Sequence, residues 1–360
     1  MRHKLILPIL AVAVLALAFP LQTALAQGGV VQGTVINKTT GEPVPEQLLE
    51  LHVTLPNGRE APVLEATSGP NGTFAFEGVE PAPGTQLALC ATYLGVMYHD
   101  PFEAPAEGFP VSRDILVYET TSSDETISVT AAHVIFYPKP EQSAVEVLEF
   151  FTFQNSGNRT YVGATKGGVG NPGETLHFTL PQGASNGTLH QGLSEEQVTW
   201  HEGGFCSLAP VFPGEQQIVY YYGLPYSGKG KLQFVRPIDY RPAEILVMTS
   251  GNQGQVTGQG VVSQGPMDLQ EEGQFGVYSA TLSPSQDTLN LELSGLGGGS
   301  GIRGNFKFLA GGLTGLGLIG GLFLAVALKR RRALVPAMVR PGRTIATDPD
   351  EEEWDDNERK

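Results

Sequence analysis

Hydrophobic and polar residues alternate along several short stretches of this chain, and that pattern limits the fold more than any other feature. The alternation is clear in residues 49–55, 176–180 and 288–293. A side-chain period of two is typical of β-strands with one buried and one solvated face, as in antiparallel sheets. Turn signals such as Asn57-Gly58 separate these stretches. The pattern predicts an all-β protein of antiparallel β-sandwich units, with one helix expected only in a C-terminal apolar segment.

Two uncharged apolar segments lie near the ends of the chain. The first follows the basic residues of 2–4 and ends in a small-residue cleavage site at 24–26, so residues 1–26 are predicted to be a secretory signal peptide. The second, residues 308–328, is long enough to span a bilayer and is followed at once by the basic cluster 329–332. Both signals predict a single-pass protein of the cell membrane, with its N-terminal domains exported and its C-terminal tail cytoplasmic.

The second apolar segment carries glycines at a spacing that favours helix packing. Gly311 with Gly315, and Gly317 with Gly321, each form a G-x-x-x-G pattern. This pattern lets two helix backbones approach closely, so it predicts association of the segment with itself or with another membrane protein. Glycine is also common in membrane helices in general, and that alternative stays open.

Composition excludes several classes of protein. The 360 residues carry a formal net charge of −15, which argues against nucleic acid as a partner. Two cysteines exclude a disulfide-rich scaffold. Glycine- and proline-rich stretches then divide the chain into a first β unit at 28–100, a second at 112–295, a glycine-rich stalk at 296–307 and a tail at 329–360. The proline-rich residues 101–110 are predicted to connect the first unit to the second.

The first unit resembles a known family. Its residues 33–44, with Gly41 and Pro43 in a tight turn, and its residues 72–79, in which Gly72 precedes a strand, resemble the carboxypeptidase regulatory-like domain. The resemblance implies a transthyretin-like sandwich of seven strands. It also implies an accessory or structural module on an exported protein, here a prokaryotic envelope protein. The wider fold overlaps with carbohydrate-binding-like sandwiches.

No catalytic constellation is evident in the sequence. None of the seven histidines has a glutamate three positions later, as the zinc carboxypeptidases require. Residues 183–187 match the G-x-S-x-G motif of hydrolases, but β-like sequence follows where that motif needs a helix. The chain is therefore predicted not to be an enzyme, and no cofactor or metal is expected.

Three aromatic residues and two cysteines are candidates for other roles. Trp200, Tyr220 and Tyr222 could form an aromatic platform for a sugar, and the alternative for them is packing in the core. Cys90 and Cys206 lie in different units and would be exported, so a disulfide between them is chemically permitted. Each thiol also fits a small buried position.

These observations predict a membrane-anchored protein of the cell envelope. Its β-sandwich modules would present a non-enzymatic surface for protein–protein binding or assembly. The alternative is carbohydrate binding by the N-terminal sandwich. The expected partners are the membrane, a protein of the envelope or a second copy of the chain, and a polysaccharide in the alternative case.

Overall fold

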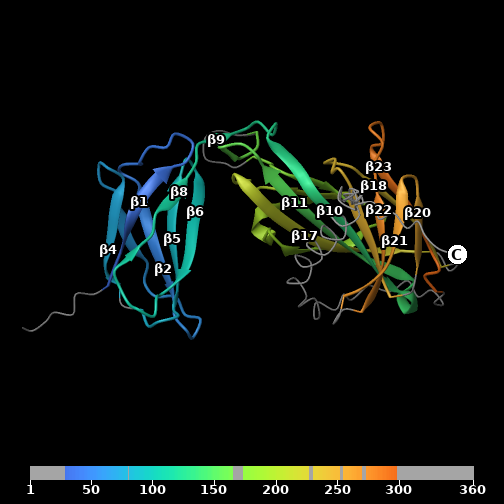
Figure 1. Ribbon diagram of the computed structural model, residues 1–360, viewed down its shortest axis with the longest axis horizontal. Helices are drawn as coiled ribbons and strands as arrows, with labels where there is room; N and C mark the ends of the chain where they lie inside the picture. Colours follow the sequence, from blue (N-terminus) through green and yellow to red (C-terminus); the bar gives the residue numbers. More distant parts are fainter. Residues whose placement is uncertain are drawn as a thin grey trace, which may run out of the picture.

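The computed structural model describes most of the chain before residue 298, and Figure 1 shows two β units along its longest axis. The described residues are 29–79, 81–164, 173–226, 230–251, 254–269 and 273–297. The predicted signal peptide, the apolar segment with its four glycines, and the tail lie outside these ranges. Within them, no helix has the length and apolar character needed to cross a membrane.

The first unit is a sandwich of two four-stranded sheets. One sheet has the order β3 (Leu64–Thr67), β2 (Leu48–Thr54), β5 (Gln86–Tyr93) and β6 (Val96–Glu103). The other is built around β1 (Gly29–Asn37), which pairs with β4 (Thr73–Val79) on one side and with β7 (Val111–Ser112) and β8 (Ile115–Val117) on the other. The sandwich therefore has more strands than the seven that the family resemblance implies.

The residues that the sequence pattern predicted to face the core of this sandwich are buried. Phe74 and Phe76 of β4 are buried with their rings edge to face, while the residues between and beside them are exposed. Gly72, just before that strand, has a φ of 73°, and a side chain there would begin 2.7 Å from the Cβ of Pro43. The predicted glycine turn is confirmed, because this position needs both a positive φ and the absence of a side chain.

The first unit does not end at residue 100. Strand β6 continues to Glu103, and Ala104, Ile115 and Val117 are buried in the same core as the earlier strands. The stretch 101–110 was predicted to connect two units, because proline and glycine are typical of linkers. It instead belongs to the first sandwich, whose last strand pairs with β1.

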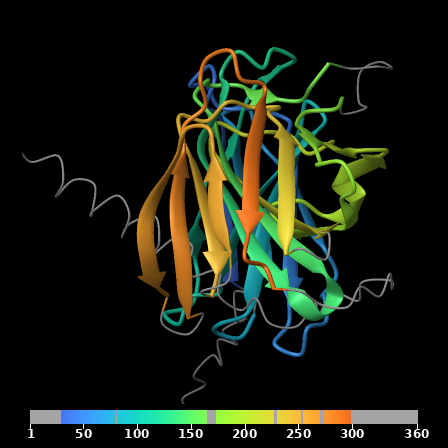
Figure 2. The ribbon, with the colours of Figure 1, turned by 90° about the vertical axis from the view of Figure 1, so that its right-hand side faces the viewer.

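The second unit contains a large twisted sheet of seven strands, seen with its neighbouring strands in Figure 2. Its strands, in spatial order, are β14 (Ser185–Gln191), β17 (Gly214–Pro225), β11 (Ala144–Asn155), β10 (Ile127–Lys139), β19 (Ile245–Ser250), β22 (Gln274–Ala280) and β21 (Val261–Asp268). Strands β10, β11 and β17 are the longest and lie side by side in it. This sheet is the frame on which the remaining strands of the unit pack.

Smaller sheets complete the second unit. They are β13 (His177–Thr179), β16 (Gly204–Ser207) and β15 (Val198–His201) in one sheet, β18 (Lys231–Pro237), β23 (Thr288–Ser294) and β20 (Gln255–Gly258) in another, and the pair β9 (Thr120–Thr121) and β12 (Thr160–Tyr161). Two 3₁₀-helices, η1 (Pro140–Gln142) and η2 (Glu195–Gln197), complete the elements of the described ranges. The all-β prediction is confirmed for this part of the chain.

The large sheet is buried on both faces at its centre. One face packs into the main core, which includes Phe136, Phe153 and Phe234, and the other carries a smaller cluster with Phe150 and Met248. Burial on both faces gives β11 an almost continuous apolar run instead of an alternation. One core extends from β10 to β23, so the second unit is a single body.

Not every strand pair is antiparallel, although antiparallel units were predicted. Strands β10 and β19 run parallel at the centre of the large sheet, as do β1 with β7 and β8, and β9 with β12. The alternation of side chains gives the face that each residue occupies, but it carries no information on the direction of the neighbouring strand.

Candidate functional site

The two units meet at a compact joint. Strand β9 follows the first unit and pairs in parallel with β12 of the second. The ring of Tyr98 on β6 packs edge to face on Phe212 of the second unit, with 5.4 Å between centroids. Its hydroxyl donates to the carbonyl of Tyr118 at 3.0 Å and lies 2.9 Å from the hydroxyl of Thr160. Tyr98 is therefore shared by both units, and burial raises the pKa of its phenol.

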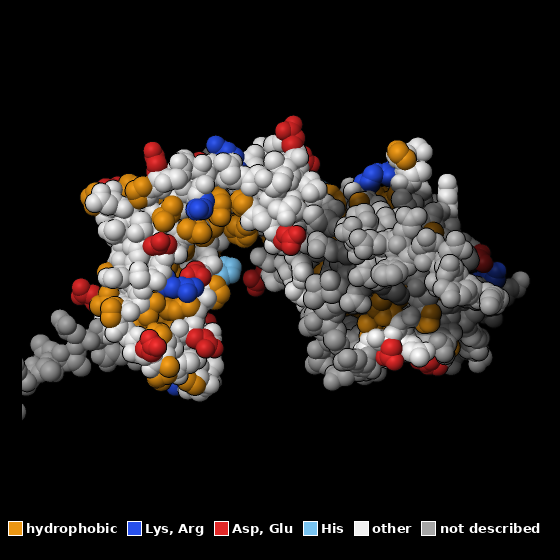
Figure 3. All heavy atoms as spheres, viewed as in Figure 1, with side chains coloured by type: hydrophobic (Ala, Val, Ile, Leu, Met, Phe, Trp, Pro, Cys, Tyr) orange, Lys and Arg blue, Asp and Glu red, His pale blue; other side chains and the backbone are white. Residues whose placement is uncertain are grey.

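A cleft of about 520 Å³ lies beside this joint. It follows the open edge of the first sandwich, where β6 and β8 lie side by side without pairing, because each is the last strand of its own sheet. Figure 3 shows hydrophobic and charged side chains of the first unit on the side that faces the second. The walls of the cleft include Tyr98, Asp100, Arg113, Leu116, Tyr118 and Phe212.

One ion pair crosses the open edge between the two sheets. The guanidinium of Arg113 donates through Nε and Nη2 to the two carboxylate oxygens of Asp100, at 2.8 and 2.9 Å. The same guanidinium lies over the ring of Phe102, 5.1 Å from its centroid. Both side chains of the pair are about one third exposed, so water screens their attraction.

The cleft has the character of a binding site. Its volume lies within the roughly 300–1,000 Å³ typical of ligand pockets, and its walls combine apolar surface with a few polar groups. None of the residues predicted from the sequence lines it. The wall residues 98–100 and 112–118 lie on either side of the proline-rich stretch that was interpreted as a linker. The apolar and charged residues that flank this stretch were the only sequence signal that could have pointed to the cleft.

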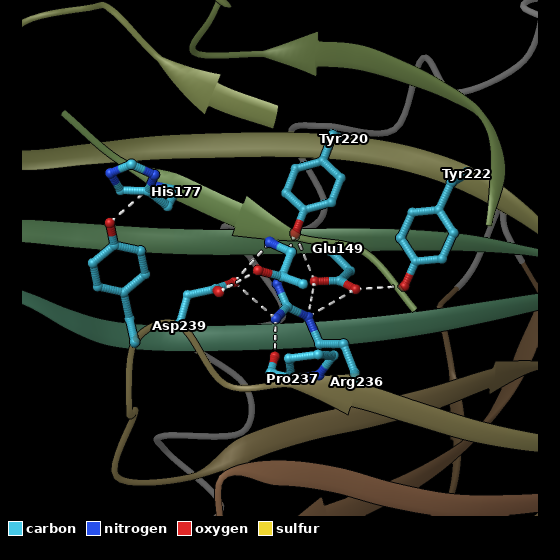
Figure 4. Close-up of polar contacts among 9 residues, drawn as sticks. Glu149, His177, Tyr220, Tyr222, Arg236, Pro237 and Asp239 are labelled. Carbon is cyan, nitrogen blue, oxygen red and sulfur yellow. Dashed lines mark hydrogen bonds and ion pairs between the residues drawn. The ribbon is translucent and has the colours of Figure 1, made fainter. Parts of the chain in front are cut away.

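A second polar cluster lies deep in the second unit and contains two of the predicted residues (Figure 4). Glu149 on β11 is fully buried, and its carboxylate accepts hydrogen bonds from the hydroxyls of Tyr220 at 2.8 Å and Tyr222 at 2.5 Å. Arg236 on β18 donates through Nε to both oxygens of the same carboxylate, at 3.1 and 2.8 Å. The cluster links the large sheet to the sheet that contains β18.

This burial corrects one prediction. The side chains of Tyr220 and Tyr222 are 1% and 0% exposed, so neither ring can stack on a sugar at the surface. Burial and the nearby carboxylate of Glu149 raise both phenol pKa values well above the ordinary range. The rings belong to the core, which is the alternative that their strand position also allowed. Glu149 was missed, although a single charge within the apolar run 147–153 is its sequence signal.

Arg236 has further partners that hold it in place. Its Nη1 contacts the carbonyl of Pro237 and a carboxylate oxygen of Asp239, and its Nη2 donates to the hydroxyl of Tyr220 at 3.0 Å. The guanidinium also lies over the ring of Phe151, 5.5 Å from its centroid. The carboxylate of Glu149, its two tyrosine partners and Arg236 are all buried, so these groups act on the stability of the unit.

Trp200 remains partly accessible. Its side chain is 38% exposed, its ring packs on Phe205 with 4.7 Å between centroids, and its Nε1 donates to the carboxylate of Glu195 at 3.1 Å. The ring also covers Gly187, where a side chain would collide with it. One face of the indole is thus used for packing, and the role of Trp200 as a ligand platform stays a prediction.

The two cysteines are in separate cores. Cys90 lies on β5 of the first unit and Cys206 on β16 of the second, and both are buried. In the described ranges no disulfide joins them. Burial, and then the nearby charge of Glu50, raise the pKa of the Cys90 thiol. The possible disulfide is therefore not formed in this structure.

Comparisons with known proteins do not assign a family. No family model matches the sequence, and no curated protein matches it. Among solved structures, the full-length major pilin SpaD from Corynebacterium diphtheriae is 11% identical with a TM-score of 0.23, covering 74% of this chain and 81% of the pilin. The major pilin subunit BcpA of Bacillus cereus is 12% identical with a TM-score of 0.19, covering 75% and 86%. Likenesses at these TM-scores carry no argument about the chain, and the family resemblance of the first unit remains a prediction.

Proposed function

We propose that this chain is a non-enzymatic binding protein of the cell envelope, anchored by residues 308–328, which holds a protein partner in the cleft beside the joint. The export signal and the membrane segment are the sequence features that support the location. The cleft is the observation that carries the binding function, because it is a formed hollow with both apolar and charged walls.

The edges of the cleft favour an extended segment of a protein as the occupant. Strands β6 and β8 end their sheets here, and edge strands present backbone groups to which another strand can pair. Leu116 on β8 is 42% exposed and lines the cleft, so it offers an apolar contact for alternate side chains of such a segment. Backbone pairing supplies affinity in this mode, and side-chain pockets supply specificity.

A carbohydrate is the second candidate occupant. Tyr118 and Phe212 place two aromatic side chains in the wall of the cleft, beside the carboxylate of Asp100 and the guanidinium of Arg113. Aromatic surface next to charged hydrogen-bonding groups suits a sugar ring, which is apolar on its faces and polar at its edges. The proposed function keeps the same cleft in this case and changes only the class of ligand.

Photo-crosslinking in the native envelope tests the proposal. A benzophenone amino acid replaces Leu116 in the full chain, and the control chain carries it at Val262, which is 59% exposed on β21 of the second unit. We expect a discrete protein adduct from position 116 and none from position 262. The adduct should disappear when Tyr118→Ala is added.

The outcomes separate the two ligand classes. If positions 116 and 262 give the same crosslinked products, or if position 116 gives none, a protein partner in the cleft is excluded. The full chain in mild detergent is then titrated with a panel of envelope polysaccharides. Saturable binding that weakens in Phe212→Ala assigns the cleft to carbohydrate, and a chain that binds neither class contradicts a binding function there.

A further inference from the structure

Three side chains with metal-binding atoms meet in the second unit, and none of them lines the cleft. They are Glu174, His177 and Cys206, and one ligand atom of each lies within 4.8 Å of those of the other two. The Nδ1 of His177 is 3.1 Å from the Sγ of Cys206. The thiol is buried, the carboxylate is half-buried, and the imidazole is exposed, so the group forms a site at the surface with one buried ligand.

The backbone fixes two of these side chains on the same face of a sheet. His177 and Cys206 are directly opposite each other in the antiparallel pair of β13 and β16. Side chains in such a pair point to the same side, with their Cβ atoms about 4.5–5.5 Å apart. This spacing brings an imidazole and a thiol into contact without any change in the backbone.

Several hydrogen bonds hold this part of the sheet in place. The amide of His177 donates to the phenol oxygen of Tyr240 at 3.0 Å, and the amide of Thr179 donates to Asp239 at 2.9 Å. On the side of Glu174, the amide of Thr175 donates to the carbonyl of Ser207 at 2.8 Å. Backbone hydrogen bonds therefore fix the chain at or next to each of the three candidate ligands.

We propose that Glu174, His177 and Cys206 bind one Zn²⁺ ion. Thiolate, imidazole and carboxylate are the three side-chain donors of zinc sites, and this mixed set suits zinc better than the oxygen-seeking Ca²⁺ or Mg²⁺. Tetrahedral zinc with bonds of about 2.3 Å to sulfur and 2.0–2.1 Å to nitrogen separates these two atoms by roughly 3.5 Å. The observed 3.1 Å opens to this value by a small rotation of the exposed His177 ring.

Three protein ligands leave the fourth position of the ion to a water molecule. The exposed side of the site, where the His177 ring lies, gives solvent access to that position. Bound zinc joins β13, β16 and the segment before β13 through one ion, so it stabilises this part of the unit by an amount that rises with the logarithm of the free zinc concentration once that exceeds Kd. It also holds the Cys206 sulfur as a ligand, in a protein whose predicted export places it in an oxidising environment. This inference is independent of the proposed binding function of the cleft.

Cobalt substitution tests the site directly. The full chain in mild detergent, kept reduced with a phosphine, is titrated with Co²⁺, which occupies zinc sites and has visible absorption. We expect a sulfur-to-cobalt charge-transfer band in the near ultraviolet and the intense visible bands of a tetrahedral ion, saturating at one equivalent. Added Zn²⁺ should remove both by displacing the cobalt.

Variants identify the ligands. Cys206→Ser is expected to abolish the charge-transfer band, whereas Cys90→Ser, which changes the other buried thiol, should leave it intact. His177→Gln and Glu174→Gln should each weaken Zn²⁺ binding by at least about 100-fold, since loss of even an outer partner of a zinc ligand weakens binding about 10–100-fold. The circular dichroism spectrum of each variant shows that it is folded.

Three results overturn the proposal. One is the absence of any cobalt–thiolate band in folded, reduced protein. Another is a band that persists in Cys206→Ser or disappears in Cys90→Ser, because the thiolate would then lie elsewhere. Zinc binding that is equal in the wild type and in His177→Gln also contradicts the assignment.

Discussion

The two units each contain an ion pair of arginine and carboxylate, and the two pairs lie in opposite surroundings. Arg113 donates to Asp100 through Nε and Nη2, and Arg236 donates to Glu149 through Nε alone. Arg113 and Asp100 at the open edge of the first sandwich have side chains 38% and 33% exposed. Arg236 and Glu149 in the second unit are 5% and 0% exposed. The shortest contact between nitrogen and oxygen is 2.8 Å in both. The shortest distance therefore does not distinguish the two pairs, and their burial does.

This difference fits different roles for the two pairs. Water screens the exposed pair, whose net contribution is about 0–1 kcal/mol, so the edge that it crosses can open at little expense when a ligand enters. The buried pair is desolvated, and removing one partner leaves a charge that neither water nor protein compensates. The first unit thus keeps an adaptable edge at the cleft, while the second has a fixed centre.

Arg236→Met is expected to produce the largest effect. It leaves the carboxylate of Glu149 buried with only the hydroxyls of Tyr220 and Tyr222 as partners. The free energy of unfolding of the second unit should fall by about 3–5 kcal/mol. Denaturant titration, with hydrogen exchange of the amides of β11 and β18 as the readout, measures this loss of unfolding free energy in the second unit.

A double variant separates the charge from the packing. Arg236→Met combined with Glu149→Met removes both charges, and it should recover much of the lost stability because no uncompensated ion remains. If the single and double variants lose the same stability, then the long side chains matter for packing and the comparison of the two pairs fails.

Acid should destabilise the second unit through a different buried group. His133 on β10 is 5% exposed and stacks on Phe150, and burial lowers its pKa to about 4. The unfolded chain binds the proton at about pH 6.5, so the contribution of His133 to stability is constant above that pH and falls by about 1.4 kcal/mol per pH unit down to pH 4. The total is about 3 kcal/mol, measured as the change in unfolding free energy between pH 7 and pH 4.

His133→Leu provides the control for this pH dependence. Leucine has no proton to bind and suits the apolar surroundings of the smaller core cluster around Phe150. The slope between pH 6.5 and pH 4 should be shallower than in the wild type by the amount assigned to His133. An unchanged slope would show that other groups cause the acid sensitivity.

The sequence predicts best those strands that are solvated on one face. Residues 49–55 and 288–293 alternate, and they form β2 and β23. The centre of the large sheet gives no such signal, because β11 is buried on both faces and has apolar residues on both. Parallel pairing between β10 and β19 joins segments more than 100 residues apart, and no local pattern encodes that contact.

The candidate sites were harder to predict than the strands. Pro101 indicated a linker, but it lies on β6, an edge strand, where a missing amide hydrogen is tolerated. The cleft beside it depends on how two sheets end and on Phe212 from the other unit. The contact between His177 and Cys206 needs the register of β13 and β16, since 29 residues separate them in the chain.

Tyr222→Phe sharpens the comparison by changing one hydrogen bond of the buried pair. The hydroxyl lies 2.5 Å from Oε1 of Glu149, and phenylalanine keeps the ring in the core. Hydrogen bonds to charged groups contribute about 1.5–3 kcal/mol, so the unfolding free energy of the second unit should fall by about 2 kcal/mol. Tyr221→Phe on the neighbouring position of β17 is the matched control and should lose less. Equal losses would mean that Glu149 does not depend on its tyrosine partners.

Arg113→Ala should have the smallest effect of the series. It removes the exposed pair with Asp100 and the contact with Phe102, and the first unit should lose about 1 kcal/mol or less. Added salt should reduce this loss further, because ions screen exposed charges, while the loss in Arg236→Met should hardly change. A loss of about 3 kcal/mol in Arg113→Ala would contradict the comparison. The open edge would then be as rigid as the buried centre, and the cleft could not adapt to an incoming strand.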